Sequence, residues 1–121
     1  MGAERGDEMR VLVCGSRDWT DQEVIYETIR SLPDDTVIVC GDASGADYFA
    51  RNSPRSSGIT VFIADWGKYG KRAGPRRNQA MLDSGVDLVL AFSRQPVTPG
   101  TADMLARARK AGVPTFVWWQ P

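Results

Sequence analysis

Val11-Leu-Val-Cys-Gly-Ser16 and Val37-Ile-Val-Cys-Gly-Asp42 are the two stretches of sequence that decide the fold. Each is a short apolar run, rich in β-branched residues, that ends in a glycine followed by a small polar residue. A strand has a continuous apolar sequence when both faces of its sheet are covered. The glycine allows a sharp turn and the close approach of a ligand, although a plain tight turn explains it equally well. The two stretches therefore predict central strands of a covered sheet.

The rest of the chain alternates between strand and helix patterns. We expect strands at 10–14, 36–40, 59–63, 86–91 and 114–118. We expect helices from Thr20, where Glu23 completes a capping box, and over about 45–52, 75–85 and 101–111. This alternation implies right-handed crossovers and a parallel sheet. The prediction is an α/β, three-layer, Rossmann-like doubly wound fold with a five-stranded, mainly parallel sheet. It forms a single domain over 10–121, preceded by a flexible tail at 1–9.

Composition excludes several classes of function. The chain has 121 residues with fifteen acidic and fifteen basic side chains, and this zero net charge argues against a general nucleic-acid binder. It has no histidine, which excludes Ser-His-Asp and Cys-His catalysis and removes the commonest metal ligand. We therefore expect no metal and no cofactor.

The cysteines and the hydropathy of the chain indicate in which cellular compartment the protein is expected. Cys14 and Cys40 end apolar runs, so we interpret them as buried thiols; a disulfide is the alternative if their strands are neighbours. The sequence contains no apolar stretch of membrane-spanning length and no export-signal pattern at its N-terminus. These features predict a cytoplasmic protein without a membrane partner.

Ligands of doubly wound sheets bind at the carboxyl ends of the strands, near the point where the strand order reverses. Two of the expected loops follow the first two strands. The first contributes Gly15, Ser16, Arg17 and Asp18 as candidate ligand-binding residues. The second is rich in small residues that leave backbone N–H groups open to an anion, and it contributes Gly41, Asp42, Ser44, Gly45 and Asp47. A capping box is the alternative role for Ser44 and Asp47.

The third stretch, 65–79, spans most of a long loop expected at 64–74 and the start of the next helix, and it carries five basic residues and no acid between Trp66 and Leu82. Cations at the start of a helix oppose its dipole, and a bound phosphate would explain them. Arg77 and Asn78 precede Met81 by four and three residues, so they share its sheet-facing side. We name Trp66, Arg77 and Asn78 as ligand-binding candidates, the alternative being a solvated basic loop with Trp66 as a packing residue.

The fourth loop opens the last expected helix with Gly100 and Thr101, and we interpret Thr101 as its N-cap. Their N–H groups and the Thr101 hydroxyl are candidates for holding a phosphate. Asp103 lies four residues before Arg107, so an ion pair between them is the structural explanation for this carboxylate.

The loops together resemble a known family. Gly15-Ser-Arg-Asp-Trp19, Gly41-x-x-x-Gly-Ala-Asp47, Ala64-Asp-Trp66 leading to Ala73-Gly-Pro-x-Arg-Asn78, and Gly100-Thr-Ala-Asp-Met104 occur in this order. This series resembles the YspA-like, cpYpsA-related branch of the SLOG superfamily over residues 10–118. That superfamily is similar to the Rossmann class and includes the LOG and DprA/Smf proteins. The resemblance implies a nucleotide or nucleotide-derived ligand.

The resemblance also bears on catalysis. LOG proteins cleave an N-glycosidic bond with an arginine in an R-x-x-x-M setting and with the glutamate of a P-G-G-x-G-T-x-x-E motif. Arg77 matches that arginine, whereas Met104 stands at the glutamate position and cannot transfer a proton. If the protein is an enzyme, the resemblance implies a nucleotide phosphoribohydrolase with Arg77 and either Asp103 or Asp47 as catalytic residues.

One loop departs from the family pattern. Relatives commonly have Gly-Gly-Ala-Arg-Gly-Ala-Asp, and here Asp42 and Ser44 replace a glycine and the arginine. A carboxylate at Asp42 would repel a phosphate, so a ribose hydroxyl or a turn cap is its expected partner.

Three functions follow from these observations. The leading one is a binding module that senses or sequesters a nucleotide-derived small molecule without turnover. The alternatives are the phosphoribohydrolase and, supported only by the basic run, single-stranded DNA binding like that of DprA, which the zero net charge disfavours. Trp118 and Trp119 point to opposite faces of the last strand, so an exposed tryptophan favours a homodimer or higher homo-oligomer, with core packing as the alternative.

Overall fold

The computed structural model describes residues 8–54 and 58–121. Most of the tail expected at 1–9 therefore lies outside the described residues. The elements, in chain order, are β1 (Arg10–Gly15), α1 (Gln22–Arg30), β2 (Val37–Gly41), α2 (Ala46–Arg51), β3 (Ile59–Phe62), α3 (Trp66–Tyr69), a 3₁₀ turn (Gly70–Arg72), α4 (Ala73–Asp83), β4 (Leu88–Arg94), α5 (Pro99–Lys110) and β5 (Thr115–Gln120).

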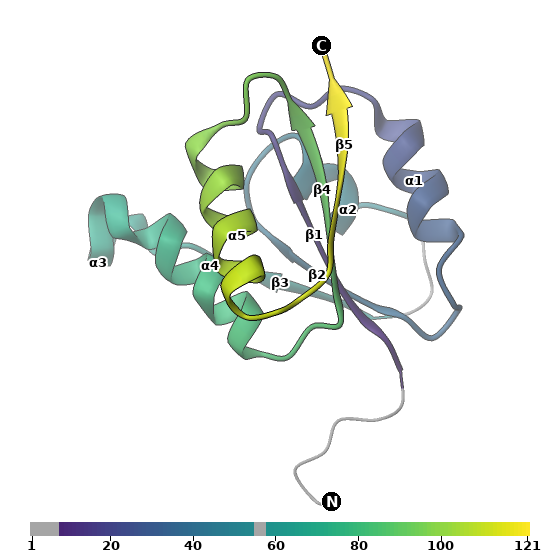
Figure 1. Ribbon diagram of the computed structural model, residues 1–121, viewed down its shortest axis with the longest axis horizontal. Helices are drawn as coiled ribbons and strands as arrows, with labels where there is room; N and C mark the ends of the chain where they lie inside the picture. The colour runs from purple at the N-terminus through teal and green to yellow at the C-terminus, as the bar shows by residue number, and fades with distance from the viewer. Residues whose placement is uncertain (1–7, 55–57) are drawn as a thin grey trace, which may run out of the picture.

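The five strands form one sheet in the order β3-β2-β1-β4-β5, and every neighbouring pair is parallel. The chain winds from β1 outward to β3, then returns to the other side of β1 with β4 and β5. The direction of winding thus reverses between β1 and β4. Helices α1 and α2 lie on one side of the sheet, and α4 and α5 lie on the other (Figure 1). The predicted three-layer α/β fold is confirmed, with a sheet that is wholly parallel.

Alternation along the strands divides the core into two clusters. Val11 and Val13 of β1 pack with Ile25 of α1 in one cluster. Leu12 of the same strand packs with Met81 of α4 in the other, which also holds the buried face of α5. The burial patterns of β1, β2 and β4 show nearly continuous burial, as expected for strands covered on both faces.

The two cysteines are free thiols on opposite faces of the sheet. β1 and β2 are neighbours, with Val13 opposite Cys40. However, Cys14 belongs to the α4–α5 side of the core and Cys40 to the α1–α2 side, so the disulfide alternative is wrong. Burial, with a smaller effect of the Asp47 carboxylate, raises the pKa of Cys40 to about 12 and raises that of Cys14 strongly as well. Neither thiol is therefore a nucleophile at neutral pH.

Several expected caps and boundaries are wrong. The Asp21 carboxylate, rather than Thr20, caps α1 by accepting a hydrogen bond from Val24 N at 3.3 Å. The last helix begins at Pro99 with Thr98 as its N-cap, so Thr101 lies inside its first turn. Pro99 has no N–H to lose and fits the first helical position, a signal that outweighs the capping tendency of Thr101.

The long loop expected at 64–74 is partly helical. Asp65 accepts a hydrogen bond from Lys68 N at 3.0 Å and starts α3, and α4 begins at Ala73, two residues before Pro75. β4 continues three residues beyond the expected end, to Arg94, because β5 pairs with it along its whole length. In Figure 1, α3 projects from one end of the molecule beyond α4.

The two final tryptophans have different surroundings, as their alternation predicts. Trp118 stacks on Phe92 with 4.7 Å between ring centroids, whereas Trp119 is 50 % exposed. Whether Trp119 contacts a second copy of the chain stays a prediction. Across residues 8–54 and 58–121, none of the helices combines the length and apolar character needed to cross a bilayer.

Candidate functional site

A cleft of about 680 Å³ opens at the carboxyl edge of the sheet. It lies beside β1, between the loops after β1 and β2 and the first turns of α4 and α5, which is the point where the strand order reverses. Its volume lies in the usual range for small-molecule sites. Six of the predicted ligand-binding residues that line it are Gly15, Arg17, Asp18, Asp47, Trp66 and Arg77. Asn78, Gly100, Thr101 and the candidate catalytic residue Asp103 line it as well.

The remaining predicted residues do not line the cleft. They are Ser16, Gly41, Asp42, Ser44 and Gly45. Ser16, Asp42 and Ser44 make hydrogen bonds that hold the loops of the cleft or a residue lining it.

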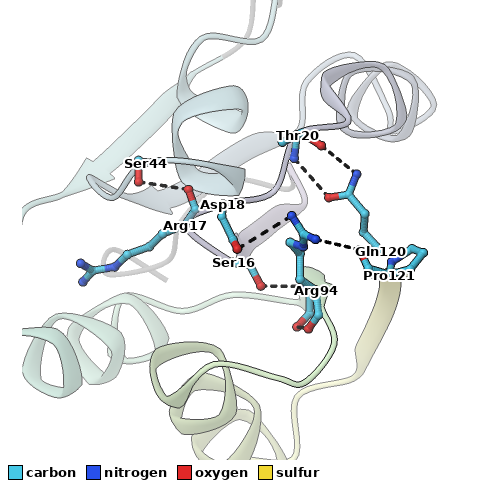
Figure 2. A network of polar contacts seen from close by, with 9 residues as sticks. Ser16, Arg17, Asp18, Thr20, Ser44, Arg94, Gln120 and Pro121 are labelled. Atoms are coloured by element: carbon cyan, nitrogen blue, oxygen red, sulfur yellow. Dashed lines mark hydrogen bonds and ion pairs between the residues drawn. The ribbon is translucent and has the colours of Figure 1, made fainter.

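Ser16 holds the loop after β1 in place. It is fully buried; its hydroxyl accepts a hydrogen bond from Arg94 N at 2.8 Å, and its carbonyl accepts one from Ala46 N at 3.1 Å. Figure 2 shows the hydrogen bond between Ser16 and Arg94 together with the pairing of Thr20 and Gln120, and it shows Arg17 extending away from both. The loop is therefore rigid at its base and presents Arg17 to the cleft.

Arg17 meets an aromatic side chain from a distant part of the sequence. Its guanidinium carbon lies 5.7 Å from the centroid of the Trp66 ring, within the range of a cation–π interaction. Trp66 is 47 % exposed, and a Cβ placed on Gly74 would lie 3.3 Å from the indole. Glycine at position 74 thus leaves room for the ring at the edge of the cleft.

The loop after β2 uses its polar side chains internally. The Ser44 hydroxyl donates to the Arg17 carbonyl at 3.1 Å, and Asp47 accepts from Ala43 N at 3.2 Å. The N-cap of α2 is Gly45, and no side chain caps the helix. The capping-box alternative for Ser44 is therefore wrong, because its hydroxyl fastens this loop to the loop after β1.

Arg77 is held below the surface by Asp42. One guanidinium nitrogen lies 2.7 Å from the Asp42 carboxylate, and the Arg77 side chain is only 11 % exposed. Its Nε is buried and has no hydrogen-bond partner in the described part of the chain. A Cβ at Gly41 would lie 2.6 Å from the Asp47 carboxylate and 2.8 Å from the Arg77 guanidinium, so a larger residue at position 41 would displace these two side-chain ends from their present positions. Asp42 therefore pairs with a cation, where a ribose hydroxyl or a turn cap was expected.

Asp47 is a buried carboxyl group at the cleft. Burial raises its pKa above the ordinary 3.8, against the opposing effects of the Arg77 guanidinium and the Ala43 N–H. The unfolded chain therefore ionises at this residue before the folded chain does, so the folded state loses stability as the pH rises from about 4 through the folded pKa.

This coupling makes a prediction for Asp47→Asn. The amide keeps an acceptor for Ala43 N–H but never ionises, so the variant should gain stability relative to the parent as the pH rises from 4 to 7.5. Urea denaturation at the two pH values measures the difference, in which each pKa unit corresponds to about 1.4 kcal/mol. If the difference in free energy of unfolding between Asp47→Asn and the parent does not change with pH, the raised pKa of Asp47 is contradicted.

Asp103 is engaged by two partners. Its Oδ2 accepts from Arg107 Nε at 2.9 Å and from the Asn78 amide at 3.0 Å. The ion pair with Arg107 expected from the spacing is confirmed, and Asn78 also donates to the Gly100 carbonyl at 3.3 Å. Asn78 is buried and thus ties α4 to the first turn of α5. Met104 is buried beside the cleft, as its apolar side chain requires.

The first turn of α5 faces the cleft with open donors. No side chain caps it, Pro99 has no N–H, and the N–H groups of Gly100 and Thr101 have no intrahelical partner. The positive end of the helix dipole adds to these donors. This end of a twelve-residue helix is suited to an anion.

Some lining residues were not singled out from the sequence. Lys71 was expected only as a member of the basic run, and Thr98 and Pro99 only as part of a loop, yet all three line the cleft. The proline at the first helical position could have revealed the true start of α5. Nothing in the sequence alone distinguishes Lys71 from the neighbouring Arg72.

Comparison with known proteins gave two matches. The model of the YspA, cpYpsA-related SLOG family matches residues 9–69, which include β1, β2 and α3. The chain is also similar to the "Gene 61 protein" of Mycobacterium phage D29, with 36 % identity over 118 residues, covering 88 % of this chain and 94 % of that protein. No solved structure matched the chain.

Proposed function

We propose, from the premise that this chain belongs to the YspA, cpYpsA-related SLOG family, that its cleft binds a nucleotide or a nucleotide-derived small molecule and does not turn it over. The observation that carries the proposal is the position of the cleft. It lies where the winding of a parallel sheet reverses, and the uncapped first turn of α5 faces it. Ligands of such sheets bind at this point, and phosphates bind at such helix ends.

The phosphate is expected at the first turn of α5. Gly100 and Thr101 supply backbone N–H groups, and Lys71, an exposed residue that also lines the cleft, supplies an ammonium group. Arg77 is a weaker candidate for this role than the sequence suggested, because Asp42 already neutralises it. Its contribution is to hold the floor of the cleft in shape.

The base is expected at Trp66. An indole that is half exposed at the edge of a cleft offers a face on which a planar base can stack. Arg17 lies against the same ring and is free of any ion pair among residues 8–54 and 58–121, so it can turn toward the ligand.

Binding without turnover agrees with the state of the carboxylates. N-glycosidic cleavage requires a free acid–base group near the sugar. Asp103 is occupied by Arg107 and Asn78, and the position that carries a glutamate in LOG proteins holds Met104. Asp47, the other acid–base candidate for the hydrolase, accepts a hydrogen bond from Ala43 N, and Asp18, which also lines the cleft, pairs with Arg94 at 3.9 Å.

The test is a panel of nucleosides and nucleotides measured by native mass spectrometry and thermal shift. We expect binding by phosphorylated members, and an affinity at least about tenfold lower for Lys71→Ala and for Trp66→Ala, the loss of one charged contact or one stacked base. Lys110→Ala is the control, because this exposed lysine lies in the last turn of α5. No binding by any member would refute the proposal, and release of free base at high protein concentration would favour the hydrolase.

A further inference from the structure

The cations of the chain fall into two groups. Most described arginines are satisfied: Arg77 and Arg107 by carboxylates within 3 Å, for example, and Arg51 by the Ala43 carbonyl at 2.6 Å. A second group has no ion pair with any carboxylate in the described part of the chain. Besides Arg17, its members near the cleft are Lys68, Lys71, Arg72 and Arg76, all exposed, which we call the basic strip.

The helix dipole of α4 does not explain three of the four cations of the basic strip. Arg109 and Lys110 are also unpaired, but they lie in the last turn of α5, where the dipole favours cations. Lys71 and Arg72 immediately precede α4 and Arg76 lies in its first turn, which contains no acidic residue. The dipole of α4 disfavours cations at that end, so Lys71, Arg72 and Arg76 are unfavourably placed, and a bound anion would offset this cost; Lys68 instead lies in the last turn of α3.

Two cations of the basic strip, Lys68 and Arg76, contact the ring of Tyr69. The guanidinium carbon of Arg76 lies 4.0 Å from the centroid of that ring and the Lys68 ammonium lies 5.1 Å from it. These cations come from α4 and α3, and together they lower the pKa of the Tyr69 hydroxyl, with Lys68 as the main cause. A local positive potential therefore extends from α3 onto α4.

The basic strip is continuous with the cleft. Lys71 belongs to both, and Trp66, Gly74 and Pro75, which alternate with the strip along the chain, also line the cleft. A ligand whose first phosphate lies at α5 and Lys71 would carry any further phosphate out of the cleft toward Arg72 and Lys68. We infer that the basic strip binds a second phosphate group of the ligand, in addition to the one at the first turn of α5. The preferred ligand is therefore a nucleotide with at least two phosphate groups.

This inference rests on the proposed nucleotide site, and two ligand chemistries would satisfy it. The second phosphate could belong to a polyphosphate chain or to a phosphodiester linking a second nucleotide. The experiment is therefore a titration with a nucleoside 5′-monophosphate, the di- and triphosphates of the same nucleoside, and its 5′-phosphorylated dinucleotide, followed by calorimetry at 50 and 200 mM salt.

We expect the di- and triphosphates, the dinucleotide, or both kinds of ligand to bind about tenfold more tightly than the monophosphate. The slope of log affinity against log salt concentration should be steeper by about one for each added phosphate contact. The variant Lys68→Ala/Arg72→Ala should lose this gain and the added salt dependence while keeping monophosphate affinity. Both side chains are exposed, so folding should be preserved. Arg109→Ala/Lys110→Ala, which removes the same charge elsewhere, should leave every affinity unchanged.

The outcomes distinguish failure of this inference from failure of the proposed nucleotide site. A gain with the triphosphate alone or with the dinucleotide alone supports the inference and identifies the source of the second phosphate. Equal affinity for all members, or a gain that survives Lys68→Ala/Arg72→Ala, overturns the inference and leaves the nucleotide site standing. Failure of every member to bind overturns both.

Discussion

Asp42→Ala is expected to lower the free energy of unfolding by about 2–4 kcal/mol, because it removes the carboxylate hydrogen-bonded to the buried Arg77 guanidinium and leaves only Asp47, a carboxyl group that burial disfavours as an anion, beside it. The Asp42 carboxylate lies 2.7 Å from Arg77, whose side chain is 11 % exposed and whose Nε already lacks a partner. The expected loss lies at the lower end for a buried pair, since Asp42 itself is 31 % exposed and water can partly solvate the gap. Urea denaturation followed by tryptophan fluorescence measures the change.

Two further variants isolate the cause. Asp42→Ala/Arg77→Met removes both charges and should recover most of the loss, because an apolar side chain needs no counter-ion. Glu23→Ala breaks a 3.9 Å pair with Arg30 at the surface and should cost less than about 0.5 kcal/mol. The explanation fails if the double variant is as unstable as Asp42→Ala alone.

Gly45→Ala is expected to be still more damaging. Gly45 has φ 70° and ψ −126°, and a Cβ there would overlap the backbone carbonyls of Ser16 and Arg17. The change should cost about 1–3 kcal/mol for the backbone conformation and at least about 2 kcal/mol more for the overlap, since backbone cannot move aside as a flexible side chain can.

Gly70 provides the matched control, with nearly the same backbone conformation, φ 55° and ψ −133°. No atom lies within 4 Å of a Cβ placed there. Gly70→Ala should therefore show only the conformational cost, and the difference between the two variants measures the overlap. Equal midpoints of urea denaturation for the two variants would show that Gly45 is not confined by the loop after β1.

The fold could be predicted from the sequence because its signals are local and agree with one another. The apolar runs ending at Cys14 and Cys40 and the alternation with helical patterns suffice for a covered parallel sheet. The place of the cleft follows from the same pattern, because the carboxyl ends of parallel strands share one edge. Arg77 and Asn78 were also correctly assigned to the sheet-facing side of their helix, where Asn78 is buried.

Side-chain partners could not be predicted in the same way. Asp42 and Arg77 are 35 residues apart, and Ser44 bonds to the carbonyl of Arg17, 27 residues away. Spacing along one helix predicts contacts such as Asp103 with Arg107, but pairs between elements depend on how the elements pack. Arg77 was expected to bind the phosphate, and that expectation did not take account of its ion pair with Asp42.

The hydrogen bonds between Thr20 and Gln120 have a consequence for synthesis of the chain. Thr20 N donates to the Gln120 side chain at 3.2 Å, and that side chain donates back to the Thr20 hydroxyl at 3.0 Å, across 100 residues of sequence. Because domains fold as units and distant contacts form late, the loop that carries Arg17 gains this support only after Gln120 has left the ribosome. A nascent chain stalled before β5 would thus lack both hydrogen bonds at the loop that carries Arg17.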